Sequence, residues 1–114
     1  MRKQIVESAA YEVATQVRAL EDSIDAALVE LAELQTRMIH ARGVTGAGFA
    51  NSHAAFEPLA AIATGLIAAR GGTAHCHVAL AETRKTIAGL RTVSWGDTYE
   101  CPDTKGSVDL RVVA

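Results

Sequence analysis

The chain has 114 residues, enough for one domain and too few for two independent hydrophobic cores. Eleven Lys and Arg residues against 13 Asp and Glu residues give a net charge of −2, which excludes a nucleic-acid binder held mainly by phosphate contacts. Apolar residues make up 49% of the chain, which excludes a disordered protein, and two cysteines (Cys76 and Cys101) are too few for a disulfide scaffold.

Residues 3–40 are predicted to form one long helix. Apolar residues recur there at alternating spacings of four and three, the pattern of a coiled-coil contact. The residues of this pattern are Val6, Ala10, Val13, Val17, Leu20, Ile24, Ala27, Leu31, Leu34 and Met38. Acidic and other polar residues fill the remaining positions.

A glycine-rich stretch follows the first helix. Gly43, Gly46 and Gly48 are predicted to end it and to form a turn. Their arrangement resembles a phosphate-binding loop in composition alone, because no strand precedes it and no Gly-Lys-Ser/Thr ending follows. Pro58 is tolerated in the first turn of a helix, so it could mark the true start of the second helix.

Residues 53–91 are predicted to form a second long helix. Its apolar pattern comprises Ala55, Leu59, Ile62, Leu66, Ala69, Thr73, Cys76, Leu80, Thr83, Ile87 and Leu90. The phase of this pattern is unchanged across Gly71-Gly72, although two glycines cost a helix about 2 kcal/mol relative to alanine. One helix is therefore expected, and the glycine pair is the position at which it could bend.

Residues 92–114 are β-prone. Gly96-Asp97 suits a tight hairpin turn, and residues 108–112 alternate in hydropathy as a strand does. This tail forms either a small meander or an arm that orders against a partner. Its candidate partner-binding residues are Trp95, Tyr99, Val108, Leu110 and Val112.

The fold predicted from these elements is mainly α, a long antiparallel helical hairpin with a β-prone C-terminal tail. Charge gives the orientation weak support, since residues 1–40 carry a net −3 and residues 41–91 a net +3. With a turn centred near Gly46, Glu7 is expected near Arg84 and Lys85, and Asp22 near Arg70.

A single hairpin leaves much of its apolar width in water, and Ala61, Gly65 and Ala69 form a ridge of small residues suited to close helix packing. We therefore expect a homodimer that forms a four-helix bundle. The alternative is that the tail folds back as a lid. The predicted self-association residues are Val13, Val17, Leu20, Ile24, Leu31, Leu59, Ile62, Gly65, Leu66, Leu80 and Ile87.

Residues that could carry chemistry are few. His75-Cys76-His77 are weak candidates for a metal site, because a helix places His75 and His77 about 200° apart. His40 and His53 flank the glycine turn but lack a third ligand. No catalytic residue and no cofactor are therefore predicted.

The expected function is non-enzymatic: a self-associating assembly or adaptor protein, bound to no nucleic acid and no membrane. A cytoplasmic location is expected, because the apolar stretch Leu59–Ala69, about 11 residues, falls short of the roughly 20 that a membrane span requires. The alternatives are a metal- or thiol-dependent sensor or enzyme that uses His75, Cys76 and His77, and a helical bundle that binds a small ligand near Gly71-Gly72.

Overall fold

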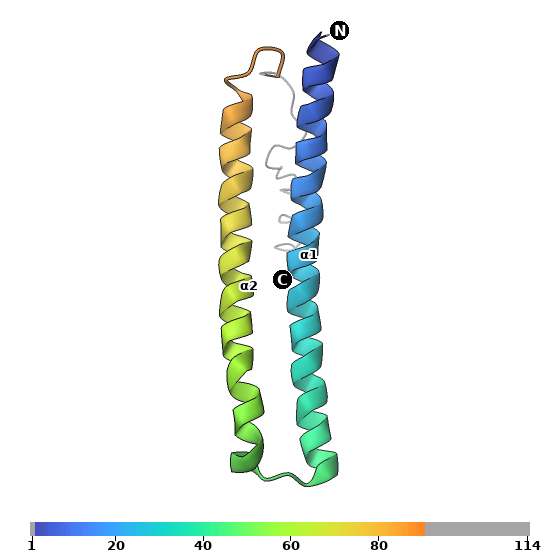
Figure 1. The fold of residues 1–114 in the computed structure, drawn as a ribbon, viewed down its shortest axis with the longest axis vertical. Helices are drawn as coiled ribbons and strands as arrows, with labels where there is room; N and C mark the ends of the chain where they lie inside the picture. The colour runs from blue at the N-terminus through green and yellow to red at the C-terminus, as the bar shows by residue number, and fades with distance from the viewer. Residues whose placement is uncertain (1, 91–114) are drawn as a thin grey trace, which may run out of the picture. The chain divides into compact units, whose positions relative to one another are not determined.

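The computed structural model describes residues 2–90, which form two long helices (Figure 1). Helix α1 spans Arg2–Thr45 and helix α2 spans Phe49–Arg84. No strand occurs among these residues, so the prediction of a mainly helical chain with two long helices is confirmed. The predicted tail, with Trp95, Tyr99, Val108, Leu110 and Val112, lies outside the described residues.

Helix α1 continues five residues beyond its predicted end at residue 40. It passes through Gly43 and ends at Thr45, whose hydroxyl donates a 2.9 Å hydrogen bond to the carbonyl of Ala41. Gly46 then takes a left-handed conformation, with φ of 72°, and its amide donates to the carbonyl of Arg42 at 3.0 Å. Glycine reaches this conformation without a Cβ clash, so the second glycine of the stretch ends the helix.

Helix α2 begins at Phe49, four residues before its predicted start. Pro58 lies inside it, more than two turns after the first residue, so the prediction that this proline marks the first turn is wrong. A proline at an interior position donates no backbone hydrogen bond, which weakens the helix locally. The amide of Ser52 and its hydroxyl both bond to the carbonyl of Gly48, so regular helical bonding is established before the proline.

The C-terminal part of α2 confirms one expectation and corrects another. The helix passes through Gly71-Gly72 as a single element, as predicted, but it ends at Arg84 rather than at residue 91. Amides of residues 85–87 bond to carbonyls three positions earlier, and Gly89 has a φ of 91°. The chain therefore leaves the α-helix through tight turns that the apolar spacing of Ile87 and Leu90 does not reveal.

The chain divides into two compact units, and each helix contributes to both. Of the described residues, unit 1 contains 2–20 and 73–90, and unit 2 contains 21–72. Within each unit, a stretch of α1 runs antiparallel to a stretch of α2 (Figure 1). The buried hydrophobic residues among those described are Ile24 in unit 2, and Ala81 and Leu90 in unit 1, which is a small core.

Helix α2 is also long and apolar enough to cross a membrane, judged by length and composition alone. The sequence prediction counted only the uninterrupted apolar run, whereas the helix as a whole contains few charges. One such helix is weak evidence for a membrane span, since the packing helix of a soluble bundle has the same character.

Candidate interaction surface

In each unit, α1 and α2 pack through two rows of residues, and the members of a row are seven positions apart in the sequence. The sequence pattern predicted one of the two rows, which we call the reference row. In α1 the reference row is Ala10, Val17, Ile24, Leu31 and Met38, all buried or half-buried. We call the residues three positions after each reference residue the plus-three row, and those four positions after it the plus-four row. Three residues of a helix turn about 300°, which is 60° short of a full circle, and four residues turn about 400°, which is 40° beyond it. The plus-three and plus-four rows therefore lie on opposite sides of the reference row.

The coiled-coil pattern places the plus-three row of α1 in the contact, but the structure uses the plus-four row more fully. Half-buried residues of the plus-four row are Ala14, Glu21, Leu28 and Arg42. In the plus-three row, Val6 and Ala27 are half-buried, whereas the larger side chains of Val13, Leu20 and Leu34 remain 46–49% exposed. The apolar stripe of α1 is wider than one neighbouring helix can cover, so pairing within the chain leaves most of one row outside.

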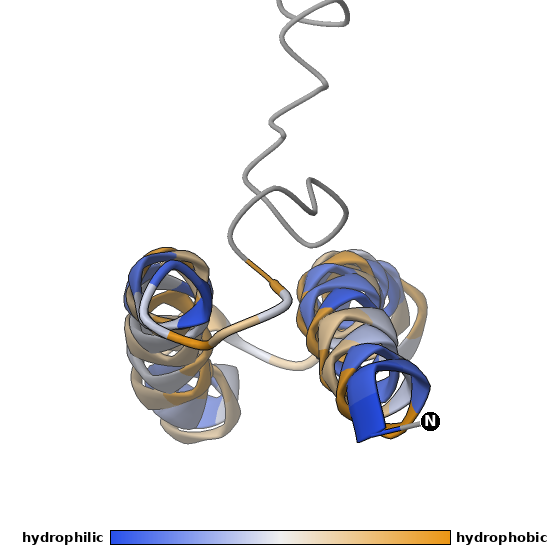
Figure 2. Ribbon diagram, turned by 90° about the horizontal axis from the view of Figure 1, so that it is seen from above, coloured by the Kyte–Doolittle hydropathy of each residue, from blue (hydrophilic) through white to orange (hydrophobic). Residues whose placement is uncertain are grey.

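Helix α2 shows the same arrangement. Its reference row is Leu59, Leu66, Thr73 and Leu80, and the half-buried members of its plus-four row include Ala63, His77 and Arg84. The plus-three row is exposed, with Ile62 at 44%. Hydrophobic residues accordingly appear on more than one side of both helices (Figure 2).

The plus-three rows of the two helices lie on the same side of each unit. Two right-handed helices that run antiparallel present corresponding rows on one side of the pair, as in antiparallel coiled coils. We call this side the apolar face. In unit 1 its plus-three rows are Val6, Val13 and Leu20 in α1 and Cys76 and Thr83 in α2, and in unit 2 they are Ala27 and Leu34 in α1 and Ala55, Ile62 and Ala69 in α2.

Small residues extend the apolar face on α2. Pro58, Gly65, Gly72 and Ala79 alternate with the plus-three row at heptad spacing, and all four are exposed. The hydroxyl of Thr83 donates to the carbonyl of Ala79 at 2.9 Å, so its polar group is used within the helix. In α1 the corresponding neighbours include Glu30 and Arg37, which give the face a polar rim.

The opposite side of unit 2 is charged. Nε of Arg70 lies 2.7 Å from Oδ1 of Asp25, and this exposed pair links the two helices but contributes at most about 1 kcal/mol. The hydrogen bond that Arg70 donates to Asp25, followed by the charges of Asp25 and Glu21, raises the pKa of Arg70, so its guanidinium stays protonated. The prediction that Arg70 lies beside Asp22 is therefore wrong by about one helical turn.

In unit 1 the basic residues at the end of α2 have other partners than the predicted Glu7. Nζ of Lys85 lies 3.2 Å from Oε2 of Glu82, and Nη1 of Arg84 donates to the carbonyl of Leu90 at 3.1 Å. The second contact fixes the turn after α2 and holds Leu90 where it is 2% exposed.

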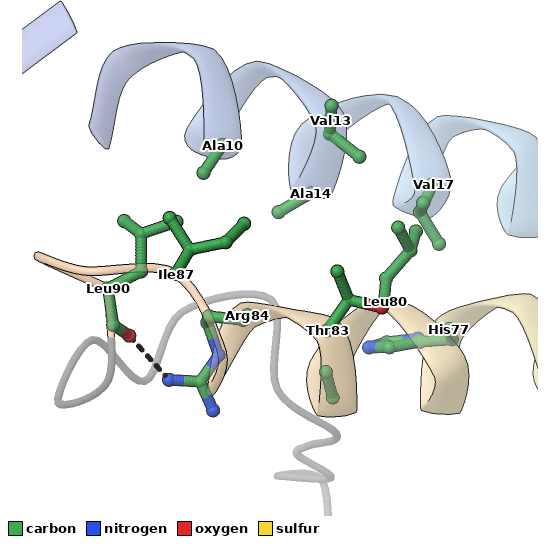
Figure 3. A pocket seen from close by; sticks show the side chains of 11 residues that line it. Ala10, Val13, Ala14, Val17, His77, Leu80, Thr83, Arg84, Ile87 and Leu90 are labelled. Atoms are coloured by element: carbon green, nitrogen blue, oxygen red, sulfur yellow. Dashed lines mark hydrogen bonds between the residues drawn. The ribbon is translucent and has the colours of Figure 1, made fainter. Parts of the chain in front are cut away.

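An apolar pocket of about 160 Å³ lies between the helices of unit 1 (Figure 3). Ala10 and Ala14 leave the space open on the side of α1, and Ile87 and Leu90 point toward it from the turn after α2. Val13 and Thr83 also line the pocket, so it borders the apolar face.

A second pocket lies at the turn end of unit 2. It is lined by Ile39, Arg42, Phe49, Ser52, His53 and Phe56. The guanidinium of Arg42 lies 5.5 Å from the ring centre of Phe49 and donates to the carbonyl of Ala47 at 3.1 Å, so it stabilises the turn itself.

The structure does not bring the candidate metal ligands together. Residues 75–77 are helical; His75 and Cys76 are exposed, whereas His77 is half-buried and lines the pocket of unit 1. Among residues 2–90, no group of three or more His, Cys, Asp or Glu side chains is arranged to hold a metal ion.

The predicted self-association residues divide into three groups. Val17, Ile24, Leu31, Leu59, Leu66 and Leu80 belong to the reference rows within the chain, while Val13, Leu20, Ile62 and Gly65 lie on the apolar face and Ile87 lines the pocket. Gly72, Ala79 and Thr83 also lie on the apolar face but were not among the predicted self-association residues, although the sequence placed Thr83 in the apolar pattern. The sequence feature that could have identified Gly72 and Ala79 is the seven-residue spacing of small residues on α2. It can be recognised once the structure shows which row of α2 packs against α1.

No family model, curated protein or solved structure matches this chain. The interpretation of the surface therefore depends on its own residues.

Proposed function

We propose that this chain is a non-enzymatic, self-associating helical protein, in which two copies bury the apolar face of each and form a four-helix bundle. Such a dimer would serve as an assembly or adaptor module, and a cytoplasmic location remains part of the proposal. The observation that carries it is the apolar face, whose larger side chains stay exposed after α1 and α2 have packed against each other.

The size of the face supports the proposal. In unit 2, α2 runs from Phe49 to Gly72, and these 24 residues are about 36 Å long at 1.5 Å per residue. A strip about 10 Å wide along each of the two helices of unit 2 offers roughly 700 Å². A stable interface buries about 600–1,000 Å² per partner, so unit 2 alone offers enough area for a dimer.

The small core of the single chain supports it as well. The described residues bury only three hydrophobic side chains, while residues such as Leu20 and Leu34 remain nearly half exposed on one face. Scattered exposed hydrophobic residues are ordinary in proteins, but a contiguous apolar face is typical of an interaction site.

Light scattering after size exclusion, on the full chain and two variants, tests the proposal. Leu34 is on the apolar face and Val29 is on another side of α1, 64% exposed. The full chain and Val29→Lys are expected at twice the chain mass, whereas Leu34→Lys is expected at the mass of one chain. A monomeric full chain at micromolar concentration would refute self-association, and a full chain that is extracted only with detergent would favour the membrane alternative.

The pocket of unit 1 favours a second candidate function, the binding of a small apolar ligand. A cavity of about 160 Å³ with apolar walls is similar in size to engineered cavities of about 150 Å³ that admit benzene. The sequence located a ligand space near Gly71-Gly72, whereas the pocket lies between residues 10–17 and 77–90. Benzene-dependent chemical-shift changes confined to Ala10, Ala14 and Leu80 would support this candidate.

A further inference from the structure

We infer that the two copies associate around a twofold axis parallel to the helices, so that α1 of each copy lies over α2 of the other. This inference deepens the proposed function and rests on it. It follows from how the sizes of the residues are distributed over the apolar face.

The two helices contribute different sizes of side chain to the face. In unit 2, α1 presents Leu34 and Ala27, whereas α2 presents Gly65 and Ala69 with the single larger residue Ile62. In unit 1, α1 presents Val13 and Leu20 against Ala79 and Thr83 of α2. In unit 1 large side chains therefore dominate the α1 half of the face and small ones the α2 half, whereas in unit 2 each helix presents one large residue.

Packing inside the chain does not require these small residues. A Cβ built on Gly65 or Gly72 would meet no atom within 4 Å, so both positions have room for a side chain in the single chain. Glycine destabilises a helix interior by about 1 kcal/mol relative to alanine. Close approach by a helix of a second copy would explain why glycine is present at positions 65 and 72 despite this cost.

Only two simple twofold arrangements bring the apolar faces of two copies together. An axis across the helices places α1 over α1 and α2 over α2, so in unit 1 large residues meet large ones and small residues face a gap. An axis along the helices places α1 over α2, so the large residues of unit 1 meet small ones, which fills space as interdigitating cores do.

The axis along the helices also fixes the register, because rotation about it leaves every residue at its own height. Asp25 lies level with Arg70 in unit 2, so Ala27 lies near the height of residue 68 and Leu34 near that of residue 61. Ala27 of one copy would then lie between Gly65 and Ala69 of the other copy, and Leu34 between Pro58 and Ile62. In each case the residue from α1 falls between two α2 residues four positions apart, as a knob does in its hole.

Cross-linking of single-cysteine chains tests the arrangement. In a background of Cys76→Ala and Cys101→Ser, one chain carries Ala27→Cys and the other Ala69→Cys. Light scattering first shows that the background chain is dimeric. The two single-cysteine chains are then mixed, allowed to exchange between dimers and mildly oxidised. The matched control replaces Ala69→Cys with Ile67→Cys, which is at nearly the same height but on another side of α2 and 61% exposed.

The mixed disulfide of residues 27 and 69 is expected to form at least about tenfold faster than that of residues 27 and 67, because contact between the thiols raises their effective concentration. Self-linking of Ala27→Cys without preference for the residue 69 partner would overturn the arrangement in favour of α1 over α1. A dimer that forms neither link would also overturn it. Both outcomes leave self-association standing, whereas a monomeric background chain refutes the inference and the proposed function together.

Discussion

Gly71 and Gly72 are adjacent in α2 but face different sides of the helix. Successive residues are separated by about 100°, so Gly72 lies on the apolar face and Gly71 does not. A Cβ at either position would meet no atom within 4 Å. Substitutions at these two positions therefore distinguish the effect of a glycine on helix stability from its effect on the proposed dimer interface.

Gly71→Leu and Gly72→Leu are both expected to stabilise the helix itself by about 0.5–1 kcal/mol, because leucine is the better helix former. Only Gly72→Leu is expected to weaken the dimer, because its side chain would hold the second copy away. The measurement is the dissociation constant of each variant by sedimentation, compared with the unmodified chain. Equal dissociation constants for the two variants would remove Gly72 from the interface.

The partner of Arg70 shows what the sequence could not provide at the scale of a residue. Opposite charge predicted correctly that Arg70 would face the acidic stretch of α1. It did not determine which acid, because one turn of α1 offers Glu21, Asp22 and Asp25. The choice of Asp25 depends on where the interhelical turn ends, and that is fixed by the backbone of Gly46 rather than by charge.

At the scale of the helices, the end of α1 depends on one of two nearby glycines. Gly46 has a φ of 72°, whereas Gly43 is inside the helix with no atom within 4 Å of a built Cβ. Gly46→Ala is expected to lower the free energy of unfolding by about 1–2 kcal/mol, because a left-handed conformation is costly for alanine. Gly43→Ala, its control, is expected to raise it by about 1 kcal/mol. Urea unfolding of both variants measures the two effects, and equal signs would place the end of the helix elsewhere.

Pro58 offers a second test of helix continuity. Since it lies inside α2, Pro58→Ala is expected to restore a backbone donor and to stabilise the chain by about 1–3 kcal/mol. Thermal unfolding followed by circular dichroism measures the change, with a rise in helical signal before the transition. If the variant is no more stable than the unmodified chain, α2 is interrupted at residue 58, and the sequence prediction of a separate preceding turn regains support.

The packing of the helices shows which contacts the spacing of apolar residues can predict and which it cannot. The four-three spacing identified both helices and both reference rows, because every packed helix must present residues at this period. It did not determine whether the plus-three or the plus-four row accompanies the reference row. The plus-three rows are the more apolar, as Val13 and Leu20 illustrate, yet the single chain covers the plus-four rows, with Ala14 and Glu21 half-buried. The sequence pattern thus includes apolar residues, such as Val13 and Leu20, that the single chain leaves nearly half exposed.

At the scale of the whole molecule, the competing prediction is that the tail, rather than a second copy, covers the apolar face. The named residues of that face run from Val6 to Thr83, all before the tail begins. A chain that ends at Arg91 is therefore expected to remain dimeric, with a dissociation constant changed by less than about tenfold, or 1.4 kcal/mol. Light scattering of the truncated and full chains at matched concentrations is the measurement.

If the full chain is monomeric and the truncated chain associates, the tail is the lid, because removing it exposes the face to other copies. If the truncated chain alone is monomeric and still helical, the tail supplies the contacts between copies, and the apolar face is not the interface.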